Sequence, residues 1–246
     1  MSPVETTPAA PPPAEPFWDW ADAAWFLAAA PLCAVASMFA LRSIDGFFGF
    51  AMSLAARALT LQAFFYLLLF GALWLILELR HNRSLWPALR FPVTRRQTAA
   101  LIPAGCALAV CVALLGAALH ARDVDNPLLR LLQDRLSIAL VGIFASTLGP
   151  AAEEALFRGF LQPLIHKTAG LAAAILSTSL LFAALHGPQY AWSWRHLLLL
   201  VLASSAFGLA RARCNSTGAS TLVHAAYNMT FFIGYLLQQR TLPAHG

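Results

Sequence analysis

Charged side chains are scarce in this 246-residue sequence: Asp, Glu, Lys and Arg make up 11% of it, whereas 59% of the residues are hydrophobic. Soluble domains carry about 25% charged residues. The mean hydropathy is +0.67. Such a small number of charges cannot cover a water-exposed surface. The composition therefore excludes an ordinary soluble domain and predicts helices that face lipid.

Cysteine is also scarce, and the motifs that would give it a role are missing. The four cysteines are scattered, with no CxxC motif and no Cys/His pair. This spacing excludes a disulfide framework and a cysteine-based metal site, and it favours small packing residues. They are Cys33, Cys106, Cys111 and Cys214.

The net charge of +5 does not indicate nucleic acid as a partner. Nearly all the basic residues are arginines in short loops between apolar runs, a pattern typical of membrane topology. The densest group lies in residues 80–96, which we expect to be a cytoplasmic loop whose Pro87 and Pro92 break any helix. Membrane lipids are therefore the expected surroundings.

The first 22 residues lack the basic start and the small-residue cleavage site of a secretory signal. They are rich in proline and acidic, which predicts a disordered tail before the first span. Three tryptophans near the junction of this tail and the first span suit an interfacial belt: Trp18, Trp20 and Trp25.

Apolar stretches fill the rest of the chain. A hydrocarbon core of about 30 Å needs about 20 apolar residues per helical crossing, and the sequence holds about seven or eight such stretches. No repeat of fixed period interrupts them. The expected fold is all-α, a polytopic transmembrane bundle, with N-terminal helices in residues 23–132 and a second bundle in residues 133–240. Gly149 and Pro150 predict a kink or a fresh helix start in the fourth stretch.

Ionisable residues inside apolar helices cost about 2.5 to 3.5 kcal/mol each on insertion scales, so a cluster of them calls for a function. Three segments carry such residues: GPAAEEALFRGF with Glu153, Glu154 and Arg158, FAALHG with His186, and LVHAAYN with His224 and Asn228.

Helix geometry separates the roles of the two adjacent glutamates. Successive residues point about 100° apart, whereas Glu154 and Arg158 are i and i+4 neighbours on one face. We therefore expect Glu154 to pair with Arg158, which lowers the cost of burying both charges. Glu153 then faces a cavity between helices.

The remaining polar residues point to hydrolysis. His224 and Asn228 project from one helix face, and His186 can approach from another helix. With Glu153 they provide a base for water and donors for an oxyanion, yet no Ser or Cys stands at a matching position as a nucleophile. This set suits direct attack of water on an amide. Taken singly, the pair of Glu154 and Arg158 is explained equally well by a structural role in helix packing. Asn228 alone is explained equally well by an ordinary hydrogen bond between helices.

The segments EEALFR, FAALH and HAAYN match, in order, the EExxxR, FxxxH and HxxxN motifs of the CAAX protease and bacteriocin-processing family. The resemblance spans about residues 149–228 and includes the type 2 CAAX prenyl proteases. It implies an intramembrane endopeptidase whose cavity opens to the cytoplasm. It also implies that Glu153 with His186 activates water, that His224 with Asn228 stabilises the oxyanion, and that Glu154 with Arg158 holds the site in shape.

The residues are compatible with more than one mechanism and more than one substrate. The family is described both as metal-dependent and as metal-free: Glu153, His186 and His224 are the candidate ligands of a Zn²⁺ ion, but no HExxH pair supports this, and we favour Glu153 as a direct base. The substrate is a prenylated, leader-bearing or otherwise membrane-associated polypeptide. Aromatic residues near the cavity line a groove for it or, more simply, fill the core: Phe157, Phe160, Phe182, Tyr190 and Tyr227.

Other functions are weaker alternatives. A non-catalytic relative, such as a bacteriocin self-immunity or scaffold protein, would fit the loss of a motif residue, and none is lost. A transporter would need broken helices in both halves of an inverted repeat, and only one Gly-Pro break is present. The composition is typical of a prokaryotic protein, which places the chain in the plasma membrane as a multi-pass protein.

Overall fold

The computed structural model describes residues 16–48, 52–122 and 124–241. All regular structure in these ranges is helical, so the all-α prediction is confirmed. The long helices are α1 Trp20–Phe48, α2 Leu54–His81, α4 Arg95–Ala118, α5 Arg135–Ser146, α7 Gln162–Leu185, α8 Trp194–Cys214 and α9 Thr217–Thr241. Shorter elements are α3 Leu85–Leu89, α6 Leu148–Glu154, the π-helical segment η2 Ala155–Leu161, and the 3-10 turns η1 Leu129–Leu131 and η3 Gly187–Tyr190.

The predicted count of seven or eight spans is not confirmed. Five segments of the described chain are long and apolar enough to cross a membrane by length and composition: α1, α2, α4, α8 and a continuous stretch of 51 residues, Arg135–Leu185. The stretch contains α5, α6, η2 and α7, and its backbone turns at Gly170, where φ is 82°. Helix α9 is not among the five.

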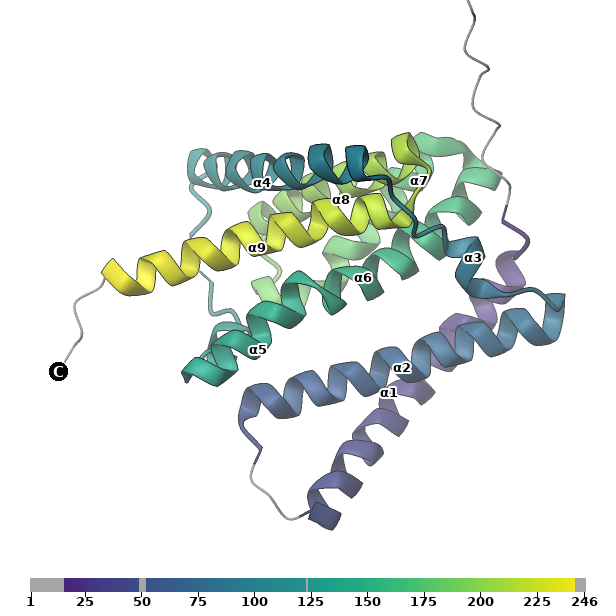
Figure 1. Ribbon diagram of the computed structural model, residues 1–246, viewed down its shortest axis with the longest axis horizontal. Helices are drawn as coiled ribbons and strands as arrows, with labels where there is room; N and C mark the ends of the chain where they lie inside the picture. Colours follow the sequence, from purple (N-terminus) through teal and green to yellow (C-terminus); the bar gives the residue numbers. More distant parts are fainter. Residues whose placement is uncertain (1–15, 49–51, 123, 242–246) are drawn as a thin grey trace, which may run out of the picture.

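The helices form two packed groups (Figure 1). Helices α1 and α2 lie side by side, while α4, α8 and α9 pack on one another, with α7 against α8. One buried cluster joins α1, α2 and α3 to η2 through residues such as Leu73, Leu89 and Phe160. A second cluster joins α4, α8 and α9 around Phe207. The segment from α5 to η2 runs between the two groups.

The residues before α1 differ from the expected tail. Residues 1–15 lie outside the described ranges, but Trp18 is buried and its Nε1 donates a hydrogen bond to the carbonyl oxygen of Phe160, 3.1 Å away. In the first turn of α1, the buried Asp22 accepts a hydrogen bond from Arg80 and contacts Nε2 of His81 at 2.8 Å. These contacts anchor the chain on η2 and α2. The interfacial position expected for Trp18 is wrong, because its ring is buried in the protein core.

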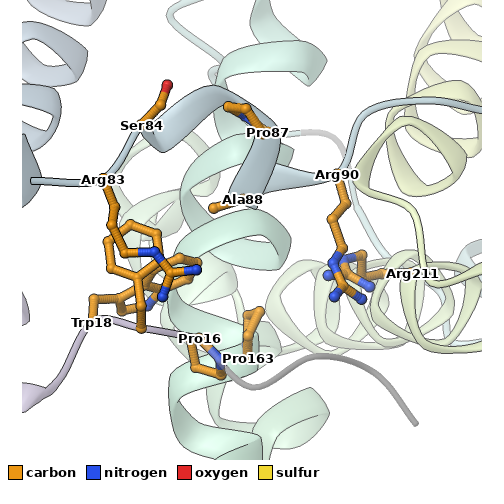
Figure 2. Close-up of a pocket in the computed structure, with 10 residues that line it drawn as sticks. Pro16, Trp18, Arg83, Ser84, Pro87, Ala88, Arg90, Pro163 and Arg211 are labelled. Carbon is orange, nitrogen blue, oxygen red and sulfur yellow. The ribbon is translucent and has the colours of Figure 1, made fainter. Parts of the chain in front are cut away.

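The arginine-rich loop contains a helix that the sequence reading excluded. Helix α3 includes Pro87, which is its third residue, a position where the backbone N–H needs no partner within the helix (Figure 2). Leu85 and Leu89 are fully buried, and this burial holds the short helix in place. Beyond α3, the carbonyl oxygen of Arg90 accepts a hydrogen bond from the backbone N–H of Thr217 at 2.7 Å, which ties the loop to the start of α9.

The predicted break near Gly149 and Pro150 is present, and it falls at Thr147. That residue has non-helical angles, φ −136° and ψ −84°, between α5 and α6. Pro150 then sits in the first turn of α6, where a proline is tolerated. The following π-helical turns of η2 carry Arg158, and such turns are frequent at functional sites.

Candidate active site

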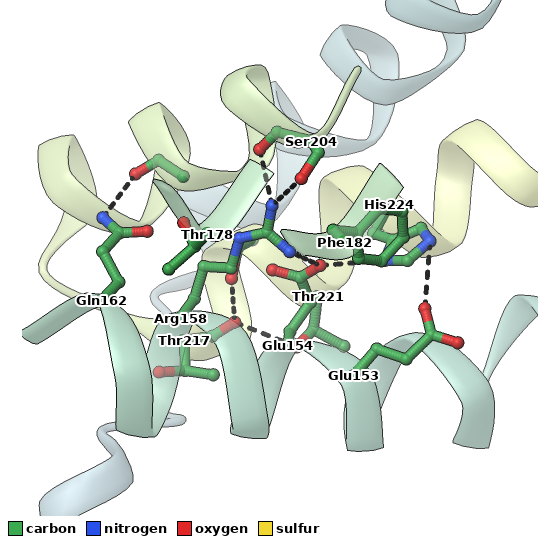
Figure 3. A network of polar contacts seen from close by, with 12 residues as sticks. Glu153, Glu154, Arg158, Gln162, Thr178, Phe182, Ser204, Thr217, Thr221 and His224 are labelled. Atoms are coloured by element: carbon green, nitrogen blue, oxygen red, sulfur yellow. Dashed lines mark hydrogen bonds and ion pairs between the residues drawn. The ribbon is translucent and has the colours of Figure 1, made fainter. Parts of the chain in front are cut away.

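The expected ion pair between Glu154 and Arg158 forms at the junction of α6 and η2 (Figure 3). Nη1 of Arg158 lies 2.9 Å from Oε1 of Glu154, and neither side chain is exposed. A charge buried alone in this position would be strongly destabilising, and the opposite charge compensates it.

Arg158 is held by more than its carboxylate. Its Nη2 donates to the carbonyl oxygen of Ser204 at 2.6 Å and also to the Ser204 hydroxyl, so α8 is tied to η2. Three phenylalanine rings surround the guanidinium, with centroids 5.5 to 5.7 Å from Cζ: Phe157, Phe182 and Phe207. Arg158 is therefore fixed in position. Ser204 was missed by sequence reasoning, because nothing local marks it among the apolar residues of α8.

Glu154 also binds His224. Oε1 of Glu154 lies 2.9 Å from Nδ1 of His224, and both side chains are buried. Since an ionised carboxylate only accepts, Nδ1 is the donor in this pair. The imidazole is further fixed by stacking on Phe207, with centroids 4.4 Å apart, and by the edge of Phe182. Arg158, Glu154 and His224 thus form one connected chain of polar contacts.

Glu153 faces the other ring nitrogen of His224. Nε2 of His224 and Oε2 of Glu153 are 3.8 Å apart, and the Glu153 side chain is 24% exposed while that of Glu154 is fully buried. The hydroxyl of Tyr66 donates to Oε1 of Glu153 across 3.4 Å. Tyr66 comes from α2 and stacks on Phe144 of α5, so a helix far from the motifs reaches the site. Sequence reasoning missed Tyr66, because its contact spans 87 residues.

His186 and Asn228 lie apart from this network. His186 ends α7, where Nδ1 contacts the carbonyl oxygen of Phe182 at 2.9 Å and the ring stacks on Phe182 with centroids 4.3 Å apart. Phe182 also touches His224, so one aromatic ring separates the two histidines. Nδ2 of Asn228 donates to the carbonyl oxygen of Ala145 at 2.7 Å, which joins α9 to α5. Within the described residues, neither side chain bonds to Glu153 or His224.

The candidate Zn²⁺ ligands are not arranged as a metal site. Nδ1 of His224 already binds Glu154, and His186 is turned toward its own helix. In the part of the chain that the structure describes, no three His, Cys, Asp or Glu side chains form a group that could hold a metal ion. Zinc needs three or four such ligands at about 2.0 to 2.3 Å, so this geometry does not fit the ion.

The aromatic residues expected near the cavity mainly fill the core. Phe157, Phe160 and Phe182 are buried, with exposures of 6% or less. Phe160 packs on Trp18 and Phe26, and Phe157 on Phe182. Packing is therefore the role that the structure gives these three residues.

The fold and this network define a helical membrane protein. In its interior, Arg158, Glu154 and His224 form a buried series of polar contacts, and Nε2 of His224 faces the partly exposed Glu153. Residues 135–230 match the family model described as type II CAAX prenyl endopeptidase Rce1-like. All six candidate residues fall inside the match, whereas Tyr66 and Trp18 lie outside it. Searches among curated proteins and solved structures returned no significant match.

Proposed function

We propose that this protein is an intramembrane endopeptidase in which Glu153 activates a water molecule for attack on a peptide bond. The observation that carries the proposal is the geometry around His224, whose Nδ1 is fixed by Glu154 and whose Nε2 is directed at the partly exposed Glu153. The separation of 3.8 Å is longer than a hydrogen bond, and a substrate water can bridge the two groups.

The chemical step then needs no covalent intermediate. The Glu153 carboxylate takes one proton from the water, and the water oxygen forms a bond to the carbonyl carbon of the substrate. The tetrahedral intermediate collapses when Glu153 returns the proton to the amide nitrogen and the C–N bond breaks. The products are a carboxylic acid and an amine.

The remaining residues serve this step in different ways. In the proposed mechanism, Nε2 of His224 faces the reacting atoms, and Glu154 and Arg158 keep its ring in one orientation. Asn228 positions α9 against α5, and its second N–H remains available to the oxyanion. His186 reaches the substrate from the end of α7, on the other side of Phe182.

The substrate follows from the surroundings of Glu153. A site placed among apolar helices is reached by a polypeptide that is itself held at the membrane, through a prenyl group, a leader segment or a membrane anchor. We further propose that the arginine-rich residues 80–96 face the cytoplasm and that the protein lies in a prokaryotic plasma membrane.

The test is cleavage by the purified full chain in detergent of prenylated C-terminal peptides and leader-like peptides. We expect Glu153→Gln to lower kcat/KM by about 10³-fold, the scale of a lost general base, and His224→Gln to act similarly. Glu78→Gln is the matched control, because Glu78 is a half-buried carboxylate about 18 Å further along α2 than Tyr66.

Repeating the cleavage assay in the presence of a metal chelator tests whether the activity depends on a metal ion. Activity that survives chelation and is lost in Glu153→Gln supports the glutamate mechanism, whereas loss in both arms supports a metal enzyme. Cleavage by Glu153→Gln at the wild-type rate would contradict the mechanism. A folded wild-type protein that cleaves none of the peptides would favour a non-catalytic member of the family.

A further inference from the structure

Three buried polar atoms lie between η2, α7 and α8 without a hydrogen-bond partner among the described residues. They are Nε of Arg158, Oε1 of Gln162 and Oγ of Ser179. Arg158 and Ser179 are fully buried, and Gln162 is 3% exposed. Buried polar groups in native proteins are nearly always hydrogen-bonded, and a group that no protein atom satisfies usually bonds to an ordered small molecule such as water. The three atoms therefore indicate a small ligand.

Arg158 and Gln162 reach α8 from one face of the same helical segment, because they are four residues apart (Figure 3). Nη2 of Arg158 donates to the carbonyl oxygen of Ser204, and Nε2 of Gln162 donates to that of Gly208 at 3.0 Å. Only the nitrogen of an amide can donate to a carbonyl, so this bond fixes the orientation of the Gln162 amide. The two atoms that need a partner are thus a donor on Arg158 and an acceptor on Gln162.

Ser179 lies on the face of α7 that packs against these two side chains. Ile175, one turn before it, and Gln162 both come within 3.3 Å of the position that a side-chain carbon would occupy at the same glycine of α8. Phe182, one turn after it, has its ring centroid 5.5 Å from Cζ of Arg158. Residues three or four apart share a helix face, so Ser179 stands between the levels of Gln162 and Arg158. The three atoms therefore converge on one place between the helices.

The chemistry of the three atoms selects the ligand. Nε–H of Arg158 only donates and Oε1 of Gln162 only accepts, whereas the Ser179 hydroxyl does both. An anion has no proton to donate to Oε1, and a metal cation has no lone pair to accept from Nε–H. The charge of Arg158 is already compensated by Glu154, and the other two side chains are neutral. Water is neutral, donates and accepts, and makes about three hydrogen bonds when it is buried.

We propose that one buried water molecule binds between η2, α7 and α8. It accepts a hydrogen bond from Nε of Arg158, donates one to Oε1 of Gln162 and has the Ser179 hydroxyl as its third partner. The water completes the hydrogen bonding of the guanidinium, whose two other nitrogens are already bonded, and it joins α7 to η2 by polar contacts. This site is distinct from that of the attacking water proposed at Glu153, and it does not depend on the proposed function.

The direct test is a crystal structure of the purified full chain at a resolution that shows ordered water. We expect a density peak within about 3.2 Å of Nε of Arg158, Oε1 of Gln162 and Oγ of Ser179. Direct hydrogen bonds among these three side chains, with no peak between them, would overturn the proposal.

A double-mutant cycle tests the same site in solution by thermal unfolding in detergent. Gln162→Leu and Ser179→Ala each remove one partner of the water and leave the others unsatisfied, so each should lower Tm by about 2 to 6 °C. The two side chains share the water as a common partner. The double variant should therefore lose at least about 2 °C less than the sum of the two single losses. An additive loss would contradict a shared ligand.

The matched control is Ser177→Ala, the same substitution at an exposed position of α7. The Ser177 hydroxyl donates to the carbonyl oxygen of Ala173 at 2.6 Å, so it does not contact the proposed water. Its effect should add to that of Gln162→Leu within about 1 °C. Equal coupling of Gln162→Leu to both serine variants would reduce the effect to general destabilisation and overturn the proposal. The wild-type crystal structure decides the question even if Gln162→Leu does not fold.

Discussion

Arg158 connects three elements through one side chain. It pairs with Glu154, donates to Ser204 on α8 and is enclosed by aromatic rings. Breaking such a buried pair on one side leaves the other charge uncompensated. The side chain therefore contributes to the stability of the protein as well as to the orientation of His224.

We expect Arg158→Ala to destabilise the protein by about 3 to 5 kcal/mol, because Glu154 would remain buried without its partner. Thermal unfolding in detergent measures this loss. Arg213→Ala, at an exposed position of α8, is the control and should change Tm little. An unchanged Tm for Arg158→Ala would contradict the role of Arg158 as a clamp.

Tyr66 is the residue at which the N-terminal helices reach Glu153. Tyr66→Phe removes the hydroxyl and keeps the ring that stacks on Phe144. We expect a roughly tenfold lower kcat/KM with little change in stability, since one hydrogen bond contributes about 1 kcal/mol. The matched control is Tyr235→Phe on α9. Equal activity of both variants would show that the contact with Glu153 has no part in the reaction.

At the scale of the element, helix α5 begins with a cap whose charge titrates. The carboxylate of Asp134 accepts hydrogen bonds from the backbone N–H groups of Leu136 and Ser137 and from the Ser137 hydroxyl. The hydrogen bonds from Ser137 lower the pKa of Asp134 below its usual value. A depressed folded-state pKa means that the cap stabilises the protein above the pKa of the unfolded chain and loses this effect as the pH falls through the folded-state value.

We therefore expect the cap to contribute fully at neutral pH and to weaken below about pH 4. The asparagine in Asp134→Asn can also cap the helix, but it does not titrate. The Tm of the wild type relative to this variant should therefore fall below that pH and stay constant above it. Thermal unfolding across the acidic range measures the difference. A constant difference throughout would contradict the assignment.

The contact between α4 and α9 depends on the absence of a side chain at Gly105. A methyl group there would overlap the carbonyl oxygen of Val223 and the side chain of Ala226. Gly105→Ala should therefore separate the helices and destabilise the protein by about 1 to 3 kcal/mol. Gly71→Ala on α2 is the control, because no atom lies within 4 Å of the added carbon and alanine favours the helix. Similar effects of both substitutions would contradict the tight crossing.

At the scale of the whole molecule, the N-terminal part is joined to the matched residues 135–230 by buried contacts. Trp18 binds Phe160 in η2, and the cluster around Leu73 and Leu89 packs on the same segment. The family match covers residues 135–230, yet the structure completes the surroundings of η2 and Glu153 with residues from outside it.

Trp18→Phe tests this joint, because it keeps the stacking on Phe160 and removes the indole donor. We expect a loss of about 1 kcal/mol, or about 2 to 4 °C in Tm. Trp20→Phe, at a side chain that is 50% exposed, should change Tm by less than about 1 °C. Equal losses would show that the hydrogen bond does not anchor the N-terminal segment.

The sequence alone determined the helical class, the break near Gly149 and Pro150 and the pairing of Glu154 with Arg158. These features depend on hydropathy and on the spacing of residues along one helical turn, so residues that are neighbours in the sequence suffice to predict them. The motifs EEALFR, FAALH and HAAYN also pointed to the family whose model matches residues 135–230.

Only the tertiary structure decided how these residues meet. His224 binds Glu154 across 70 residues, Ser204 binds Arg158 across 46, and Tyr66 reaches Glu153 across 87. The placement of His186 behind Phe182, the burial of Trp18 and the helical turn around Pro87 likewise follow from packing between distant segments. Local propensity contains no information on such contacts, because their energy arises only when the helices pack together.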